Sequence, residues 1–523
     1  MESAALGAMV MIFVAMTIVV LMRPAYFICD DAYFYLVAAK HLALGDGSTF
    51  NGFSRTNGYH PLWMYVSAFV YFFLRPSSTM YVAILVILNS GMFVTAVLVV
   101  RQILLRAAPR ASTYWWLSLP VLVPFFFATV LSEGPLNSLV FSAFFLFCVK
   151  ASGGDRSLRT LRITSLLAGI SIVTRLDDVF VVTFLLSVPV LIDAKNAAWR
   201  RAVLTALNLG GGVFLVLGPY LIWNYISFGH LMPISGAIKT PLESFNFPMD
   251  LHRLGPWGWR FTTAAFVVGV SAGLWRSMPL RGSILAACIG GLIHSLYVLF
   301  AMGATFTQWS WYHVPEAIIF AISFPILAQK VIDAATVKFA IPYKFALSAL
   351  IVIVFVSAFS VPVRKYYRVT TAEPNWWEFA QSIGEWVRNS TPSDARIMVD
   401  DLPGAIAYYS DRAVICADGL VSDYEYVEHV KKLGIVDYLR NKHIEYFIGG
   451  NPAIFGAPFD ADQSRQFGSI RNFTDWPSQQ VVRFFSPLGG DAVGSVDLRN
   501  ATRIAIFSFD GIPHKAIWSI PAS

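Results

Sequence analysis

The sequence predicts a polytopic helical membrane protein that ends in a soluble α/β domain. Hydrophobic residues make up 56% of the 523 residues, and charged residues make up only 14%. Soluble domains are about 25% charged, so this chain has too few charges to cover the surface of a soluble protein. The composition therefore excludes a soluble multidomain enzyme, a disordered protein and a disulfide scaffold.

The charges are also distributed unevenly along the chain. Residues 365–523 contain 15 basic and 19 acidic side chains, whereas residues 1–364 contain 24 and 13. We therefore expect a basic transmembrane domain over residues 1–364 and a mildly acidic α/β domain over residues 365–523. The basic excess is explained by membrane topology and does not indicate a nucleic-acid partner.

Eleven apolar segments are candidates for membrane spans, each of which needs about 20 residues. They are residues 4–22, 80–105, 114–131, 135–150, 161–174, 178–193, 202–226, 261–276, 283–303, 314–329 and 344–361. Residues 61–74 are shorter and predict a juxtamembrane helix in the first outer loop, lying at the interface or dipping into the membrane. The short pair 161–174 and 178–193 predicts broken or tilted spans.

The basic residues predict the orientation of these spans. If residues 61–74 do not cross the membrane, the Arg and Lys clusters between spans all fall on one side, which the positive-inside rule assigns to the cytoplasm. The first segment lacks a basic n-region and a small-residue cleavage site, so we expect a retained anchor. The chain is then a multi-pass protein of the inner (plasma) membrane with an extracytoplasmic C-terminal domain.

The C-terminal part alternates short strands with helices. Pro374 and Pro392 bracket a predicted helix over residues 375–389. We expect strands at 396–399, 413–416, 446–448, 481–486, 494–498 and 502–508, and helices near 404–410 and 423–441. The four cysteines have neither metal nor disulfide-framework spacing, so we expect buried thiols.

Acidic residues are scarce before residue 365, and most of them gather in the predicted outer loops. Eight of the thirteen lie there: Asp30, Asp31, Asp46, Glu133, Asp177, Asp178, Glu243 and Asp250. Ionisable groups near the membrane are costly and are commonly functional. Asp30 fits the cap of a helix from Asp31 to Leu44, with Gly45 after its end. One cap needs one acid, so a carboxylate remains here that could accept a proton or bind a metal.

Two further outer turns carry charges. Glu133 lies in the short turn LSEGP and is either a loop charge or a pocket residue. The segment TRLDD interrupts an apolar hairpin, and its Arg175 either forms an internal ion pair or binds an anion. Outer-loop residues His60, Lys239, Tyr312 and His313 are either interfacial anchors or, in the case of the cations, phosphate ligands.

These segments together resemble the GT-C superfamily of integral-membrane glycosyltransferases, which use polyprenyl-phosphate sugars. The likeness is to its arabinofuranosyltransferase-like enzymes and to those of the dolichyl-phosphate-mannose-protein mannosyltransferase type. Five stretches carry it in the family's order: ICDDAYFYLVAAKHLALGDGSTFNG with TNGYHPLW, LSEGP, TRLDD, GPYLIWNYISFGHLMPISGAIK, and VDDLPGAIAYYSDRAVICADGL. Ile234 and Ser235 stand where relatives often have Asn-Thr, and His60 stands where some relatives have Lys, so the donor sugar stays open.

The resemblance implies that the protein transfers a sugar, with inversion, from a polyprenyl-phosphate donor to an envelope glycolipid, polysaccharide or protein at the outer membrane face. Asp30 is then the expected base, Asp31 its alternative or orienting partner, and Glu133 a residue that positions the acceptor, the base or a metal. The residues expected to bind the donor phosphate and substrate are His60, Arg175, Lys239, Tyr312 and His313.

Cofactors and competing functions stay open in the sequence. We assign no metal site, although Asp30 and Glu133 would be the ligands of a divalent ion if one is present. A transporter or flippase of lipid-linked saccharides is the main alternative class, and a ligase or phosphotransferase acting on lipid carriers is another. Membrane lipids are expected partners in each case.

Overall fold

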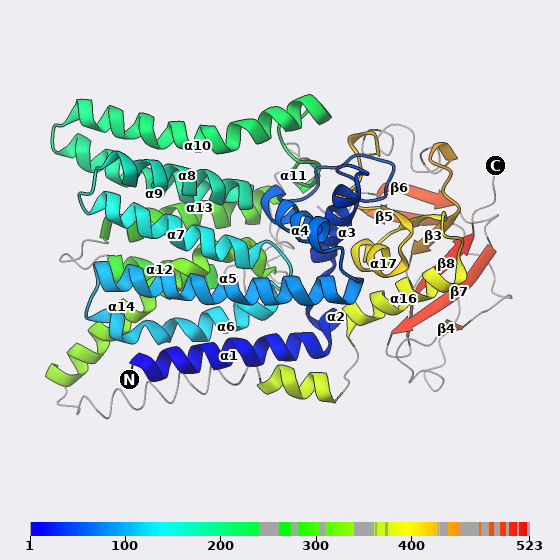
Figure 1. Cartoon of the computed structure of the whole chain (residues 1–523), viewed down its shortest axis with the longest axis horizontal. Helices are drawn as coiled ribbons and strands as arrows, with labels where there is room; N and C mark the ends of the chain where they lie inside the picture. Colours follow the sequence, from blue (N-terminus) through cyan, green and yellow to red (C-terminus); the bar gives the residue numbers. More distant parts are fainter. Residues whose placement is uncertain are drawn as a thin grey trace. The chain divides into compact units, whose positions relative to one another are not determined.

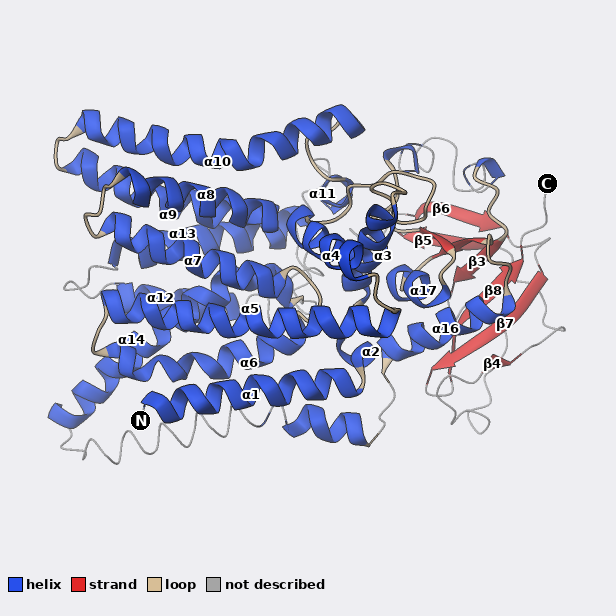
Figure 2. Cartoon of the chain, viewed as in Figure 1, coloured by secondary structure: helices blue, strands red, loops and turns tan. Residues whose placement is uncertain are grey.

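We analysed a computed structural model, drawn in Figures 1 and 2, that has two compact units. It describes residues 2–239, 261–273, 281–302, 309–338, 360, 363–371, 375–426, 428, 438, 440–449, 470–471, 481–485, 492–497, 502–509 and 512–519. Unit 1 comprises residues 1–22, 82–226 and 242–370, and unit 2 comprises residues 23–81, 227–241 and 371–523.

Unit 1 is helical, and its long helices run alongside one another (Figure 1). They are α1 (Glu2–Met22), α5 (Ser78–Ala107), α6 (Leu119–Ala128) after the 3-10 helix η1 (Ala111–Ser118), α7 (Gly134–Ser152), α8 (Leu158–Thr174), α9 (Val179–Lys195), α10 (Trp199–Phe228), α12 (Phe261–Gly273), α13 (Arg281–Tyr297) and α14 (Val314–Lys338). Of the described helical segments, seven are long and apolar enough to cross a membrane. The chain is therefore an integral multi-pass membrane protein.

The structure tests the expectation of eleven spans only in part. The seven segments are Ala5–Met22, Ser78–Ala107, Ala111–Ala128, Gly134–Ser152, Trp199–Phe228, Arg281–Phe300 and Ser310–Ala334. The pair predicted to be short is short, because α8 and α9 have 17 residues each. The predicted span 344–361 lies almost wholly outside the described residues. The total number of spans and the side of the C-terminal domain stay predictions.

Unit 2 joins the first predicted outer loop to the C-terminal region. Its helices are α2 (Pro24–Phe27), α3 (Asp30–Leu44), α4 (Pro61–Leu74), α11 (Ile234–Lys239), α16 (Trp376–Ser390) and α17 (Pro403–Ser410). The 14-residue α4 is the predicted juxtamembrane helix. Arg23, just after α1, pairs with Glu378 in α16, so the segment that follows the first span is tied to the C-terminal region. The expected boundary at residue 365 therefore stays a prediction.

The strands of unit 2 form a mixed sheet and a two-stranded ribbon (Figure 2). They are β1 (Arg396–Val399), β2 (Ala413–Cys416), β3 (Tyr446–Gly449), β4 (Ile470–Arg471), β5 (Val481–Phe485), β6 (Ala492–Asp497), β7 (Thr502–Phe509) and β8 (Ile512–Ser519). The sheet order is β2-β1-β3-β8-β7-β4, and β1 is parallel to β2 and β3. The predicted α/β character is confirmed, whereas β4 and β8 were not predicted. The predicted helix 423–441 is described only in part.

Helix α3 ends as expected but begins differently. Gly45 follows it with a φ of 99°, a conformation that favours glycine at the end of a helix. The helix starts at Asp30 rather than Asp31, and the residue before it is Cys29, whose side chain makes no capping bond. The prediction that Asp30 caps its own helix is therefore wrong, because its carboxylate binds the start of another helix.

Candidate functional site

Five ionisable side chains of unit 1 form a buried cluster, which we call the Arg175 cluster. Its members come from four places in the helical unit: the turn before α7, the turn between α8 and α9, α13 and α14. They are Glu133, Arg175, Asp177, His294 and Glu316; Asp177 is half-buried and the other four are buried. Charges buried this deeply must be paired, because an isolated ion loses its hydration.

The members of the Arg175 cluster are linked by direct contacts. Arg175 donates from Nη1 to Glu133 Oε1 at 2.5 Å and from Nη2 to Asp177 Oδ2 at 2.9 Å. The His294 ring nitrogens lie 3.2 Å from Asp177 Oδ2 and 2.8 Å from Glu316 Oε1. The chain of contacts therefore connects the Glu133 turn to α14 through one arginine and one histidine.

The surroundings of Arg175 bear on the two roles open to it. Its Nε lies 2.8 Å from Asp177 Oδ1, and its guanidinium lies over the Tyr312 ring, 4.4 Å from the ring centre. All three guanidinium nitrogens thus face carboxylates. This geometry favours the internal ion pair for Arg175 and a buried anchor for Tyr312. It also gives Glu133 a cationic partner.

The turn that carries Arg175 is braced by a second carboxylate. Asp178 accepts hydrogen bonds from Asn137 Nδ2 at 3.2 Å and from Ser171 Oγ at 2.8 Å. Asn137 lies one turn into α7, close in sequence to Glu133. Both acids of the TRLDD segment therefore hold the α8–α9 turn against its neighbours.

Sequence reasoning left His294 and Glu316 out of the candidate site. The available signal was a lone histidine within a predicted span and a lone acid in the first turn of another, since ionisable groups inside spans are uncommon. His313 precedes α14 and is buried, as is Tyr312. Both therefore lie in the part of unit 1 that holds Glu316.

In unit 2, Asp30 binds the start of helix α17. Its Oδ2 accepts the Gly404 amide at 3.1 Å, and its Oδ1 accepts the Ala405 amide at 2.8 Å. Asp30 is 7% exposed. Burial raises the pKa of Asp30 well above its usual range, and the two amides oppose that rise. A carboxylate at a helix N-terminus satisfies amides that have no partner within the helix.

Helices α3 and α17 lie side by side and run in the same direction, and further contacts hold them together. Tyr33 and Tyr409 share a hydrogen bond of 2.9 Å between their hydroxyls. Beyond the end of α17, Lys40 pairs with Asp411 at 2.6 Å. Helix α3 and α17, the helix between β1 and β2, are thus one packed pair.

The remaining candidates of unit 2 lie on short elements. Asp31 follows Asp30 in the first turn of α3 and is less buried than it. His60 precedes α4, and Lys239 is the last residue of α11. The amide of Ile234, which starts α11, donates to Asn57 Oδ1 at 3.0 Å. Residues 57–60 and α11 therefore belong to one local assembly.

The described residues offer no evident metal centre. Within the described ranges, no group of three or more His, Cys, Asp or Glu side chains is arranged to hold a metal ion. Asp30 engages backbone amides and Glu133 engages Arg175. The two residues named as ligands for a divalent ion therefore do not fit that role in this structure, and we derive no step through a metal.

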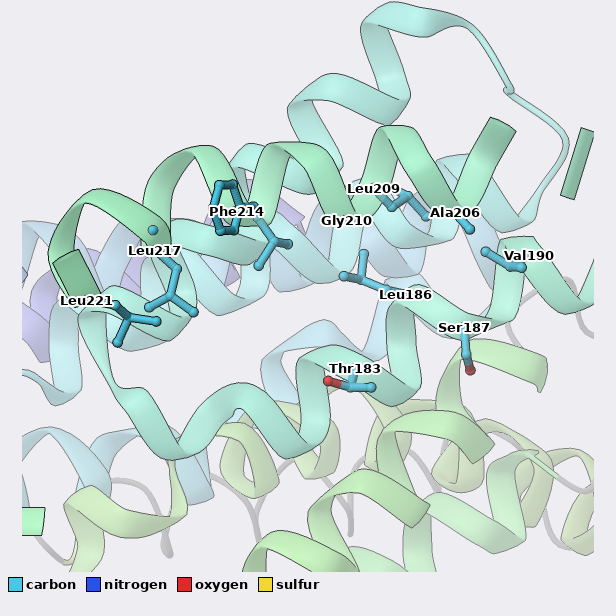
Figure 3. Close-up of a pocket in the computed structure, with 12 residues that line it drawn as sticks. Thr183, Leu186, Ser187, Val190, Ala206, Leu209, Gly210, Phe214, Leu217 and Leu221 are labelled. Carbon is cyan, nitrogen blue, oxygen red and sulfur yellow. The ribbon is translucent and has the colours of Figure 1, made fainter. Parts of the chain in front are cut away.

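An apolar groove runs between α9 and α10 in unit 1 (Figure 3). Its volume is about 370 Å³. The α9 wall has Thr183, Leu186, Ser187 and Val190, and the α10 wall has Ala206, Leu209, Gly210, Val213, Phe214, Leu217, Gly218 and Leu221. Eight of the twelve lining residues have aliphatic or aromatic side chains and none is charged, which suits a hydrocarbon chain.

Comparisons with known proteins were made at the level of sequence and of structure. Residues 366–493 match the family model described as "Domain of unknown function (DUF8728)". No curated protein sequence matches the chain significantly. The structure is similar to that of ArnT from Cupriavidus metallidurans bound to undecaprenyl phosphate, with a TM-score of 0.54, 14% identity and 98% of each chain covered.

Two other solved structures show lesser similarity. ArnT from the same organism in the apo state gives a TM-score of 0.53 at 12% identity, again over 98% of each chain. An Archaeoglobus fulgidus oligosaccharyltransferase in complex with zinc and sulfate gives a TM-score of 0.44 at 11% identity, over 84% of this chain and 68% of that one. The similarity to ArnT over almost the whole chain shows that this protein shares the fold of ArnT.

Proposed function

We propose that this chain transfers a sugar from a polyprenyl-phosphate donor to an acceptor of the cell envelope. The observation that carries the proposal is the ArnT-like fold over 98% of the chain, together with the ArnT structure that holds undecaprenyl phosphate. The apolar groove between α9 and α10 adds a surface suited to an isoprenoid chain. The active site lies on the outer face of the inner membrane, and the acceptor is a glycolipid, a polysaccharide or a protein.

The reaction is a direct displacement at the anomeric carbon with inversion. The acceptor oxygen forms the new bond to that carbon, and the bond to the phosphate oxygen breaks, so the polyprenyl phosphate leaves with the electron pair. A carboxylate takes the acceptor's proton. Negative charge grows on the phosphate, so a nearby cation stabilises the transition state.

We assign the base to Asp31 and give Asp30 the role of orienting it. Asp30 is buried with both oxygens on the α17 amides, whereas Asp31, the next residue, is more accessible. Lys239 and His60, both in unit 2, are the cations for the donor phosphate. Glu133 acts within unit 1, where it pairs with Arg175 and thereby positions the turn that carries this arginine.

Paired variants test this assignment. Asp31→Asn should lower transfer from a labelled polyprenyl-phosphate sugar by about a hundredfold or more, because general-base catalysis contributes about 10²–10⁴-fold, while thermal stability stays near wild type. Asp30→Asn should lower the melting temperature as well, because an amide presents one acceptor oxygen to two backbone donors. Wild-type turnover in Asp31→Asn would overturn the assignment of the base. Equal stability of the two variants would remove the structural role of Asp30.

A further inference from the structure

The turn after strand β2 carries a carboxylate that the proposed mechanism has not used. Asp418 accepts hydrogen bonds on its Oδ1 from the Leu420 amide at 2.9 Å and from the Cys416 thiol at 2.6 Å. Gly419 has a φ of +80°, which suits glycine at this turn. Both contacts use the same acceptor oxygen, which an amide side chain could supply as well as a carboxylate. The turn itself therefore does not require the negative charge of Asp418.

The same turn packs tightly against two other segments of unit 2. A side chain on Gly58 would come within 1.8 Å of the Leu420 carbonyl oxygen, and one on Gly419 would come within 2.9 Å of the Ile238 side chain. Ile238 directly precedes Lys239 in α11. The Tyr424 hydroxyl also donates to the Met232 carbonyl. These close contacts hold the turn beside the end of α11 and beside the segment before α4.

Two charged residues of unit 2, Asp31 in α3 and Lys239 in α11, influence the ionisation of Asp418. Burial raises the pKa of Asp418 to about 6, the negative charge of Asp31 adds to the rise, and the positive charge of Lys239 opposes it. The Cys416 thiol and the Tyr426 phenol are its other titratable neighbours. Asp418 directly precedes Gly419 and Lys239 directly follows Ile238, so the close approach of Gly419 to Ile238 brings the Asp418 carboxylate near the assigned phosphate cation.

We propose that Asp418 is a positioning residue of the transfer site, whose carboxylate holds the Lys239 ammonium where the donor phosphate binds. The C-terminal region then supplies part of the site's chemistry. This inference rests on the proposed function. Lysine has a long, flexible side chain, so an ionic partner on a rigid turn defines where its charge is presented.

The variant Asp418→Asn separates this role from a structural one. Asparagine keeps the Oδ1 acceptor that the Leu420 amide needs, so the turn is retained and only the charge is lost. The matched control is Asp423→Asn in the same loop. Asp423 Oδ1 accepts the Tyr426 amide at 2.6 Å, and no role in the site is assigned to it.

The readout is the binding of undecaprenyl phosphate to the purified full-length protein, measured with Asp418→Asn, Asp423→Asn, Lys239→Met and the double variant Asp418→Asn/Lys239→Met. We expect Asp418→Asn to bind undecaprenyl phosphate about tenfold to a hundredfold more weakly than wild type. Without its ionic partner, the Lys239 ammonium should lose its hydrogen bond to the phosphate, and losing a hydrogen bond to a charged group usually has an effect of this size. Asp423→Asn should bind like wild type. In the Lys239→Met background Asp418→Asn should have no further effect, because Asp418 acts through that lysine.

The outcomes separate this inference from the proposed function. If wild type does not bind undecaprenyl phosphate, the proposed function fails and takes this inference with it. If wild type binds and Asp418→Asn binds equally well, only the inference is overturned. Tighter binding by Asp418→Asn also overturns it, since the carboxylate would then merely repel the phosphate. An equal loss with and without Lys239 would show that Asp418 does not act through it.

Discussion

Arg175 donates from Nη1 to Glu133 Oε1 at 2.5 Å, and its other two guanidinium nitrogens face Asp177. Arg175 is only 1% exposed. Breaking such a pair leaves uncompensated charge in a buried site, which costs about 3–5 kcal/mol. The pair therefore fixes the turn before α7 against the turn between α8 and α9.

The first prediction concerns the removal of this cation. Arg175→Met should lower the free energy of unfolding by about 3–5 kcal/mol, because Glu133 and Asp177 lose the guanidinium that lies between them. Adding Glu133→Gln should restore part of that loss by removing one of the carboxylates. Thermal unfolding in detergent measures both effects, with the exposed Arg162→Met in α8 as the control. If Arg175→Met is as stable as Arg162→Met, the ion pair does not stabilise the unit.

A second prediction concerns the contact between α3 and α17. A Cβ at position 404 would lie 2.4 Å from the Asp30 carbonyl oxygen and 3.0 Å from the Phe34 ring. Gly404→Ala should therefore destabilise the protein by about 1–3 kcal/mol through overpacking, which thermal unfolding would register. Gly91→Ala in α5 is the control, because nothing lies within 4 Å of its added carbon. A neutral Gly404→Ala would show that the two helices are not packed as described.

The apolar groove gives a third prediction. Gly210 lines the groove, whereas its neighbour Gly211 does not, and a Cβ at either position meets nothing within 4 Å. Gly210→Leu fills the groove and should weaken the binding of undecaprenyl phosphate about tenfold, a typical discrimination for apolar pockets. Gly211→Leu should leave binding unchanged. Equal affinities of the two variants would place the isoprenoid chain elsewhere.

Asp418 provides a prediction about pH. Burial raises the pKa of Asp418 in the folded state to about 6, above its ordinary value of 3.8, so its contribution to stability falls as pH rises through this interval. Asp418→Asn has no carboxylate to ionise at this position, so it does not lose this stability as the pH rises. The variant should match wild type near pH 4 and exceed it by about 1–3 kcal/mol above pH 7. Thermal unfolding at several pH values checks this, and a constant difference across the range would contradict it.

Much of the fold was predictable because apolar periodicity and turn residues act locally. Strands β1 and β2 match their predicted bounds, and α4 matches residues 61–74 exactly as expected from its Pro61 start. Strand β8 was missed because Pro513 and the buried Lys515 interrupt its apolar pattern. Lys515 is paired with Asp400 at 2.6 Å, a partner that only the folded chain brings near.

The candidate site was predictable only in part. The sequence marks Asp30, Glu133 and Arg175 as unusual, but it does not reveal that Asp30 binds the amides of residues 404 and 405 or that Glu133 pairs with Arg175. These partners are 374 and 42 residues away along the chain. Local sequence patterns do not encode these partners, which only the folded chain brings together.

The most direct test of the proposed function uses the purified protein, reconstituted in lipid vesicles, with a labelled polyprenyl-phosphate sugar and envelope acceptors. The proposal predicts that label passes covalently to an acceptor, that free polyprenyl phosphate appears in equal amount, and that the new bond has inverted configuration. Movement of intact donor across the vesicle membrane, with no label joined to an acceptor, would contradict it and favour a flippase.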